Sequence, residues 1–133
     1  MVNEGWVVKE NVVKEKSFSF AVRIVRLFQY LCQKKKEFVL SKQLLRCGTS
    51  VGAMVREAEH AETKADFKHK MAIAQKEINE TIYWLQLLKE TEYLSSEQFE
   101  SINQDAIEII KLITSIIKST KLTINNWSLT IDH

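Results

Sequence analysis

Apolar residues recur at helical spacing through most of this 133-residue chain, and the recurrences fall into four separate runs. Apolar side chains three and four residues apart line one face of an α-helix. The runs predict helices at about residues 17–35, 39–61, 64–92 and 96–119. The chain has no proline and only three glycines, which fits long helices with few breaks. We therefore expect an all-α four-helix bundle in a single domain, residues 1–133.

Start signals precede the third and fourth runs. Thr63 and Asp66 are spaced as a capping box, with Asp in place of the usual Glu. Ser95 and Gln98 have the same spacing before the fourth run. Local chemistry thus predicts where both helices begin.

The pattern changes in the tail, residues 121–133. The segment LTINNWSLTI alternates apolar and polar residues, and Asn125-Asn126 is able to form a tight turn. This predicts a short hairpin or an extended arm, which needs a surface to cover because an isolated hairpin is marginal in water. The amino-terminal residues 6–8 are a candidate partner, so the bundle is expected to carry short extended N- and C-terminal arms.

The second run carries two glycines, Gly48 and Gly52, in its interior. Each costs about 1 kcal/mol relative to Ala within an exposed helix. Close approach of another helix backbone would compensate for that cost. We expect these glycines to lie at a helix–helix contact.

Two of the predicted helices carry more apolar surface than one core needs. The first has a second apolar seam beside the first seam, and the third has apolar side chains nearly opposite its core stripe. Exposed patches of this kind are rare in monomers, so they predict self-association; the alternative is that the terminal arms cover them. The predicted interface residues are Phe20, Ile24, Leu27, Leu31, Ile73, Trp84, Leu87 and Trp127.

Composition adds mainly exclusions. A net charge of +2 is too small to imply nucleic-acid binding by itself. Cys32 and Cys47 lack metal-type or redox-type spacing and are interpreted as reduced core thiols. The N-terminus lacks the apolar run of a signal peptide, and the longest apolar stretch, residues 107–117, is too short to span a bilayer. These features predict a cytoplasmic protein without membrane contact.

No phosphate-binding loop or nucleophile motif is present, so no catalytic residue, cofactor or small-molecule substrate is predicted. Glu57-x-x-His60 and Asp66-x-x-His69 echo the ligand spacing of bundle di-metal sites. Their helical phases lie away from the core stripes, and both pairs flank the turn between the second and third helices. A bundle metalloprotein remains an alternative, and the prediction is no metal.

Basic residues gather around the turn between the first two helices. They form either a phosphate-contacting patch or a solvated helix end whose charges favour the helix dipole. No aromatic side chains are interleaved with the lysines, which argues against sequence-specific binding of single strands. The candidate nucleic-acid contacts are Arg23, Arg26, Lys34, Lys35, Lys36, Lys42 and Arg46.

Several local patterns occur in an order that covers about residues 11–119. The matching residues are Asn11-Val12-Val13, Lys16-Ser17, Phe20-Ala21, Gln43-Leu44, Arg46, Ser50-Val51, Glu57, Asp66-Phe67 and the stretch 72–80 with Ala74 and Glu77. In this order they resemble the bacterial 23S rRNA intervening-sequence protein family.

That resemblance implies an up-down-up-down bundle that assembles as a ring, typically a homopentamer, without known catalytic activity. Some members are encoded within sequences inserted into 23S rRNA genes. Related accessory variability determinant proteins accompany reverse transcriptases in diversity-generating retroelements. Both contexts imply RNA or nucleoprotein partners. The family-motif residues carried over are Arg46, Ser50, Glu57 and Glu77.

Arg46 and Glu57 lie on one helix face about three turns apart, too far to pair with each other. We hypothesise that they form ion pairs across helices or subunits. The overall hypothesis is a non-enzymatic bundle that forms a cyclic homo-oligomer and presents its basic end to an acidic partner such as RNA. The alternative is a structural or protein-adaptor module without nucleic-acid affinity.

Overall fold

A computed structural model describes the backbone of residues 4–131 and the side chains of residues 8–120. Four helices account for nearly all of this part of the chain, and no strand occurs within it. They are α1 (Glu4–Gln33), α2 (Leu40–Glu59), α3 (Lys64–Glu90) and α4 (Ser96–Ile131).

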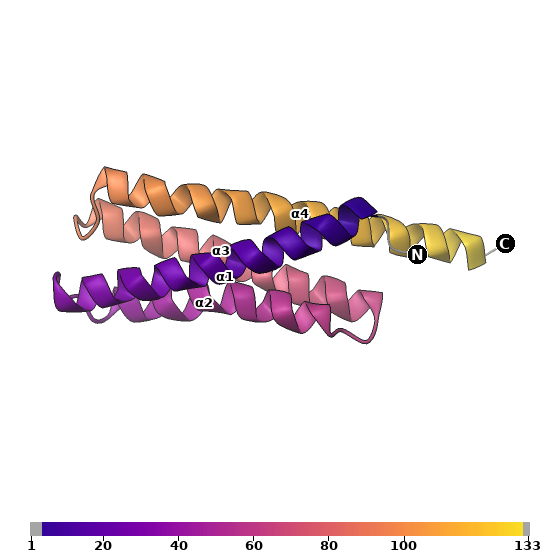
Figure 1. Ribbon diagram of the computed structural model, residues 1–133, viewed down its shortest axis with the longest axis horizontal. Helices are drawn as coiled ribbons and strands as arrows, with labels where there is room; N and C mark the ends of the chain where they lie inside the picture. The colour runs from indigo at the N-terminus through magenta and orange to yellow at the C-terminus, as the bar shows by residue number, and fades with distance from the viewer. Residues whose placement is uncertain (1–3, 132–133) are drawn as a thin grey trace.

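The helices run alternately up and down along one long axis (Figure 1). Each contacts the next helix in sequence, and α1 also contacts α4, which closes the bundle. Within the described residues the diagonal pairs, α1 with α3 and α2 with α4, make no Cα approach within 8 Å. The predicted all-α, up-down-up-down four-helix bundle is therefore confirmed.

One apolar stripe from each helix fills the space along the bundle axis. Burying a large aliphatic or aromatic side chain contributes about 1.5–3 kcal/mol, so these stripes dominate the stability of the fold. The largest side chains with less than 2% solvent exposure include Phe20, Ile24, Leu31, Leu44, Met71, Ile78, Leu85, Leu88, Ile109, Ile113 and Ile116.

The two predicted helix starts are present. The Thr63 hydroxyl oxygen accepts a 3.0 Å hydrogen bond from the Asp66 backbone N–H. Ser95 and Gln98 form the reciprocal box: the Gln98 N–H donates to Ser95 Oγ at 3.1 Å, and the Ser95 N–H donates to Gln98 Oε1 at 2.9 Å. These bonds satisfy backbone donors that the first helical turn leaves unpaired.

The prediction of an extended N-terminal arm is wrong, because α1 begins at Glu4 and not near residue 17. Val13 is fully buried, so the core stripe of α1 continues toward the N-terminus. Lys9 and Lys16 obscure that stripe in the sequence. Their long side chains reach α4, where Lys9 Nζ donates to Ser115 Oγ at 2.6 Å and Lys16 pairs with Glu108 at 2.8 Å. The side chains of residues 6 and 7 lie outside the described part.

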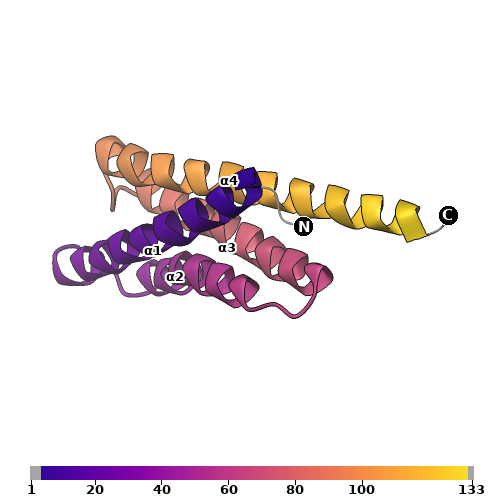
Figure 2. The same cartoon turned by 45° about the vertical axis from the view of Figure 1, so that its right-hand side comes forward.

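The predicted C-terminal hairpin is also wrong, because the backbone of α4 stays helical to Ile131. The Asn125-Asn126 pair lies within this helix and forms no turn. A continuing 4–3 apolar register favours extension of α4, whereas a lone hairpin would have no neighbouring strand. As a result α4 projects past the other helices (Figures 1 and 2).

The interior glycines of α2 lie where α1 approaches closely, as predicted. A Cβ added at Gly48 would lie 2.8 Å from Ile24 Cγ1, and one added at Gly52 would lie 3.2 Å from the Ser17 carbonyl oxygen. Both distances are shorter than ordinary van der Waals contact. The glycines therefore set the spacing and rotation of α1 against α2.

Candidate nucleic-acid interface and oligomer surfaces

The turn between α1 and α2 is organised by one carboxylate. Glu37 is only 7% exposed, and its side chain accepts three backbone N–H groups at the start of α2. The donors are Val39 at 3.0 Å, Leu40 at 2.8 Å and Ser41 at 2.7 Å. The Ser41 hydroxyl also donates to the Glu37 carbonyl oxygen at 2.9 Å. Because a negative charge at a helix N-terminus is favourable, Glu37 fixes the turn and caps α2.

Two effects on the Glu37 carboxyl oppose each other. Burial by itself would raise its pKa, but the N–H donors stabilise the charged form and outweigh burial. The pKa of Glu37 therefore lies below its ordinary value. Sequence analysis missed this residue, because an acid in a lysine-rich turn resembles a solvated surface group.

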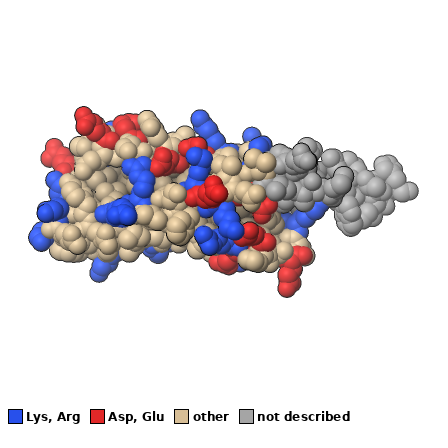
Figure 3. All heavy atoms as spheres, viewed as in Figure 1, with Lys and Arg blue, Asp and Glu red and all other residues tan. Residues whose placement is uncertain are grey.

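Four candidate contact residues lie on this turn and the start of α2. Lys34, Lys35, Lys36 and Lys42 are exposed, and Lys36 has the left-handed φ of 55° that reverses the chain. Arg26, which lies on α1 about two helical turns before this turn, is exposed as well. Within residues 8–120 none of these five cations has a carboxylate oxygen within 4 Å. The space-filling view shows basic groups at this end of the molecule (Figure 3, lower left).

The other two candidate contact residues are occupied by partners within the chain. Arg23 pairs with Asp105 at 2.5 Å and also donates to the Ser101 hydroxyl at 2.8 Å. Arg46 pairs with Glu77 at 3.3 Å and with Glu80. A phosphate would have to displace these carboxylates, so among the seven candidate contact residues only the four lysines and Arg26 have a free positive charge.

The family-motif residues lie in two groups along the α2–α3 pair. Arg46 bridges to α3 through Glu77, and the Ser50 hydroxyl donates to the Arg46 carbonyl oxygen at 2.6 Å. Glu57 pairs with Lys70 of α3 at 3.2 Å. Arg46 and Glu57 thus each form an ion pair across helices within one chain, as one form of the hypothesis required.

Three of the four interface residues predicted on α1 are buried within the single chain. Phe20, Ile24 and Leu31 are buried in the core of the single chain and are not available to a partner. Leu27 and Trp84 are partly buried against the same core. Ile73 and Leu87 are half-buried on α3, and the Trp127 side chain lies outside the described part.

The exposed apolar seam of α1 consists of Phe18 at 55%, Val22 at 37% and Val25 at 38% exposure. The two seams of α1 have similar composition, so periodicity alone did not decide which one faces the core. The signal that could have decided it is the glycine pair in α2. Ile24 and Ser17 must face α2 where side chains are absent, which turns Phe18, Val22 and Val25 outward.

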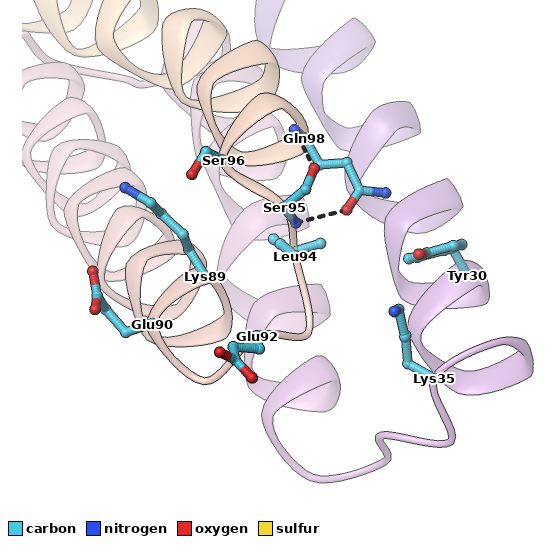
Figure 4. A pocket seen from close by; sticks show the side chains of 9 residues that line it. All are labelled: Tyr30, Lys35, Lys89, Glu90, Glu92, Leu94, Ser95, Ser96 and Gln98. Atoms are coloured by element: carbon cyan, nitrogen blue, oxygen red, sulfur yellow. Dashed lines mark hydrogen bonds between the residues drawn. The ribbon is translucent and has the colours of Figure 1, made fainter.

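A shallow hollow of about 730 Å³ separates the basic turn from the α3–α4 turn. Tyr30 and Lys35 line one side of it, and Glu90, Glu92 and Gln98 line the other (Figure 4). Glu90 and Glu92 are exposed, and acidic groups gather on that side of the end in Figure 3 (upper left). The same end of the bundle is therefore basic on one half and acidic on the other.

The residues considered for metal or thiol chemistry are not clustered. His60 and His69 are exposed, and no three His, Cys, Asp or Glu side chains within residues 8–120 are placed to hold a metal ion. Cys32 and Cys47 are both free thiols. Burial raises the pKa of Cys47, which keeps its thiol protonated.

None of the helices, over the part of the chain that is described, is both long and apolar enough to cross a lipid bilayer. The apolar stripe of α4 faces the bundle core, and charged residues such as Glu108 and Lys111 lie on the exposed side of the helix.

Comparison with known proteins identifies the family. The family described as 23S rRNA-intervening sequence protein matches residues 9–115. A crystal structure of a protein of unknown function from the S23 ribosomal protein family of Bacteroides thetaiotaomicron VPI-5482 is 62% identical. The match covers 83% of this chain and 98% of that chain, with a TM-score of 0.82. No protein with curated annotation matches significantly. The chain belongs to the 23S rRNA-intervening sequence protein family.

Proposed function

We propose that this protein is a non-catalytic RNA-binding protein whose contact surface is the α1–α2 turn. The observation that carries the proposal is the group of cations without ion pairs on that turn, Lys34, Lys35, Lys36 and Lys42, with Arg26 about two helical turns earlier on α1. Elsewhere along the bundle, arginines such as Arg23 and Arg46 are neutralised by carboxylates of a neighbouring helix.

The shape of the turn supports the same proposal. The Glu37 cap holds the backbone between the lysines and α2, so the lysines project from a fixed support. Their flexible side chains suit phosphates, which lysine binds as a point charge. The acidic side of the same end repels phosphates. A strand of RNA would therefore lie over the α1–α2 turn and avoid the α3–α4 turn.

One turn with a few lysines binds weakly, and repetition of the turn would strengthen binding. We propose that the chain forms a cyclic homo-oligomer, with five copies as the number that the family resemblance implies. Each copy would add one lysine turn to the same rim, and linked contacts raise the overall affinity without any new type of contact. The exposed apolar seam of α1 supports self-association.

The test is the salt dependence of RNA binding. Fluorescence anisotropy with a labelled, unstructured RNA is measured between 50 and 200 mM salt for the protein and for two triple variants. The first variant is Lys34→Ala/Lys35→Ala/Lys36→Ala. The control removes three exposed lysines without ion pairs elsewhere: Lys64→Ala/Lys76→Ala/Lys111→Ala.

Each neutralised phosphate contributes roughly 0.7 to the slope of log affinity against log salt for single strands. The turn variant is therefore expected to lose about two units of slope, and the control to keep the wild-type slope. Equal losses in both variants would mean diffuse charge attraction and no turn-specific site. An absence of binding at 50 mM salt would favour a structural or adaptor module instead.

A further inference from the structure

The α1–α2 turn carries two exposed apolar side chains next to its lysines. Phe38 is 51% exposed and Val39 is 72% exposed. In the chain, Phe38 follows Lys36 by two residues and precedes Lys42 by four. The turn therefore has an exposed aromatic ring with exposed cations before and after it.

The backbone on both sides of these two residues is anchored inward. The Glu37 N–H donates to the Leu31 carbonyl oxygen at 3.0 Å, and the Ser41 N–H donates to the Glu37 carboxylate at 2.7 Å. Glu37 is nearly buried, and Ser41 is fully buried. Because both anchors face the bundle, Phe38 and Val39 are held toward solvent on a fixed support. A side chain that is already in position loses less conformational freedom on binding.

The ring of Phe38 is open to a partner. Within residues 8–120, the aromatic rings that lie under a cation are those of Phe18, under Arg56, and Phe99, under Lys89. In the same part of the chain, neither a cation nor a second aromatic ring lies over Phe38. Phe38 thus offers a flat apolar surface on which another flat group could stack.

The charge around this ring has one sign. Glu37 is the only acidic residue in segment 34–42, and its carboxylate is directed at the first N–H groups of α2. The turn therefore presents only positive charge to solvent. A partner that fits both properties carries anionic groups next to flat apolar groups. Single-stranded nucleic acid has this composition, because its phosphates alternate with bases that are free to stack.

We infer that the α1–α2 turn selects single-stranded RNA, with Phe38 stacking on an unpaired base while the lysines contact the neighbouring phosphates. A duplex keeps its base faces inside the helix, so Phe38 would have nothing to stack on. Stacking tolerates any sequence, since every base has a π-face. The three consecutive lysines enclose no aromatic residue, yet the ring that follows them supplies the platform for binding without sequence preference. The inference rests on the proposed function and specifies the class of RNA.

An anionic lipid surface would also attract the lysines and accept Phe38 and Val39. The shape of this end of the bundle favours a strand of RNA. A flat membrane against the turn would also approach Glu90 and Glu92, the exposed acids across the hollow (Figure 4). A single strand is narrow enough to lie over the basic half alone.

The experiment measures fluorescence anisotropy of the full-length protein with a labelled uridine-rich single strand and with an RNA duplex of the same length. The variants are Phe38→Ala, Phe38→Leu and Phe38→Trp. The matched control is Tyr83→Ala, which removes a 56% exposed aromatic side chain from α3, outside the turn. Circular dichroism melting establishes that each variant keeps its fold.

Phe38→Ala is expected to weaken binding of the single strand roughly 5- to 150-fold and to leave duplex binding unchanged. Its slope of log affinity against log salt should equal that of the wild type, because no phosphate contact is lost. Phe38→Leu should bind as weakly as Phe38→Ala, whereas Phe38→Trp should bind at least as tightly as the wild type, since stacking requires a ring. Tyr83→Ala should behave as the wild type.

Several outcomes would overturn the inference. Wild-type affinity of Phe38→Ala for the single strand would remove the stacking contact, and a loss of slope in the triple lysine variant would still support the proposed function. Equal weakening on single strand and duplex would mean that Phe38 supports the turn and contacts no base. Phe38-dependent binding to phosphatidylserine vesicles, without such dependence for RNA, would assign the turn to a lipid surface. A triple lysine variant with the wild-type slope would remove the proposed function and this inference together.

Discussion

Helix α1 is held by close packing on one side and by long polar side chains on the other. Toward α2, Ile24 and the Ser17 backbone fill the space left by Gly48 and Gly52. Toward α4, cations reach across the seam at seven-residue intervals, and they contact partners at matching intervals. These contacts pair Lys9 with Ser115, Lys16 with Glu108, and Arg23 with Ser101 and Asp105.

The two flanks should respond differently to change. A dry, close contact has no room for added atoms, because protein interiors are packed as densely as organic crystals. An exposed ion pair has flexible partners, is screened by salt, and contributes little individually. The α1–α2 flank is therefore expected to be sensitive to volume, and the α1–α4 flank to ionic strength.

The largest effect is expected from Gly52→Leu. The added side chain would meet the Ser17 backbone, which cannot move aside without shifting α1. Overpacking of this kind costs about 1–3 kcal/mol, and backbone displacement places Gly52→Leu at the upper end. Urea denaturation measures the loss, with Ala53→Leu on the exposed neighbouring position as control. Equal stability of the two variants would contradict the close-approach explanation.

A middle-sized effect is expected at the turn that joins the two helices of the close flank. Glu37→Ala removes the carboxylate that caps α2, and loss of a cap costs about 0.5–2 kcal/mol. Thermal denaturation at neutral pH measures this change. Glu62→Ala, at an exposed acid in the α2–α3 turn, serves as control and should be near neutral.

Glu37 also gives this flank a pH dependence. Its pKa is lower in the folded protein than the ordinary value of 4.5, because N–H donors favour the charged form. Its stabilising contribution is therefore complete above that ordinary value and is lost as pH falls through the lower folded pKa. The stability difference between wild type and Glu37→Gln should shrink over that acidic window. A stability difference that stayed constant down to pH 2 would show that the negative charge of Glu37 does not stabilise the cap.

The smallest effect is expected on the polar flank. Arg23→Ala removes the pair with Asp105 and should cost about 0.2–1 kcal/mol at low salt. At 1 M salt the Debye length is about 3 Å, so the cost should decrease. Arg26→Ala, which removes a neighbouring arginine without an ion pair, provides the comparison. If the destabilisation by Arg23→Ala were independent of salt, Arg23 would stabilise the fold through packing of its side-chain stem and not through the ion pair.

The sequence correctly predicted the structural features that depend on residues close together in the chain, namely the starts of α3 and α4 and their apolar stripes. The capping boxes before α3 and α4 act within a single turn, so Thr63 and Ser95 were identified from spacing alone. The core stripes of α3 and α4 follow a regular 4–3 apolar pattern, and they are buried as expected. The end of α4 was missed because alternation in LTINNWSLTI resembles a strand, although the same residues also fit a helical register.

Contacts between distant segments could not be predicted in the same way. The partners of Arg23 and Arg46 depend on how neighbouring helices are rotated and aligned, and no local pattern specifies this. Two signals were nevertheless available. The glycine pair in α2 indicates which seam of α1 faces inward, and seven-residue spacing recurs in Lys9, Lys16 and Arg23 and in their partners on α4.

The order of helix contacts also bears on how quickly the chain folds. Four helix pairs are in contact, and three of them, α1–α2, α2–α3 and α3–α4, join helices that follow each other in sequence. Within the described residues, only the α1–α4 seam brings together residues about a hundred positions apart, such as Lys9 and Ser115. Chains dominated by local contacts fold in microseconds to milliseconds. We therefore expect the polar seam to close last, so that pairing of the two outer helices would be the slow step of folding.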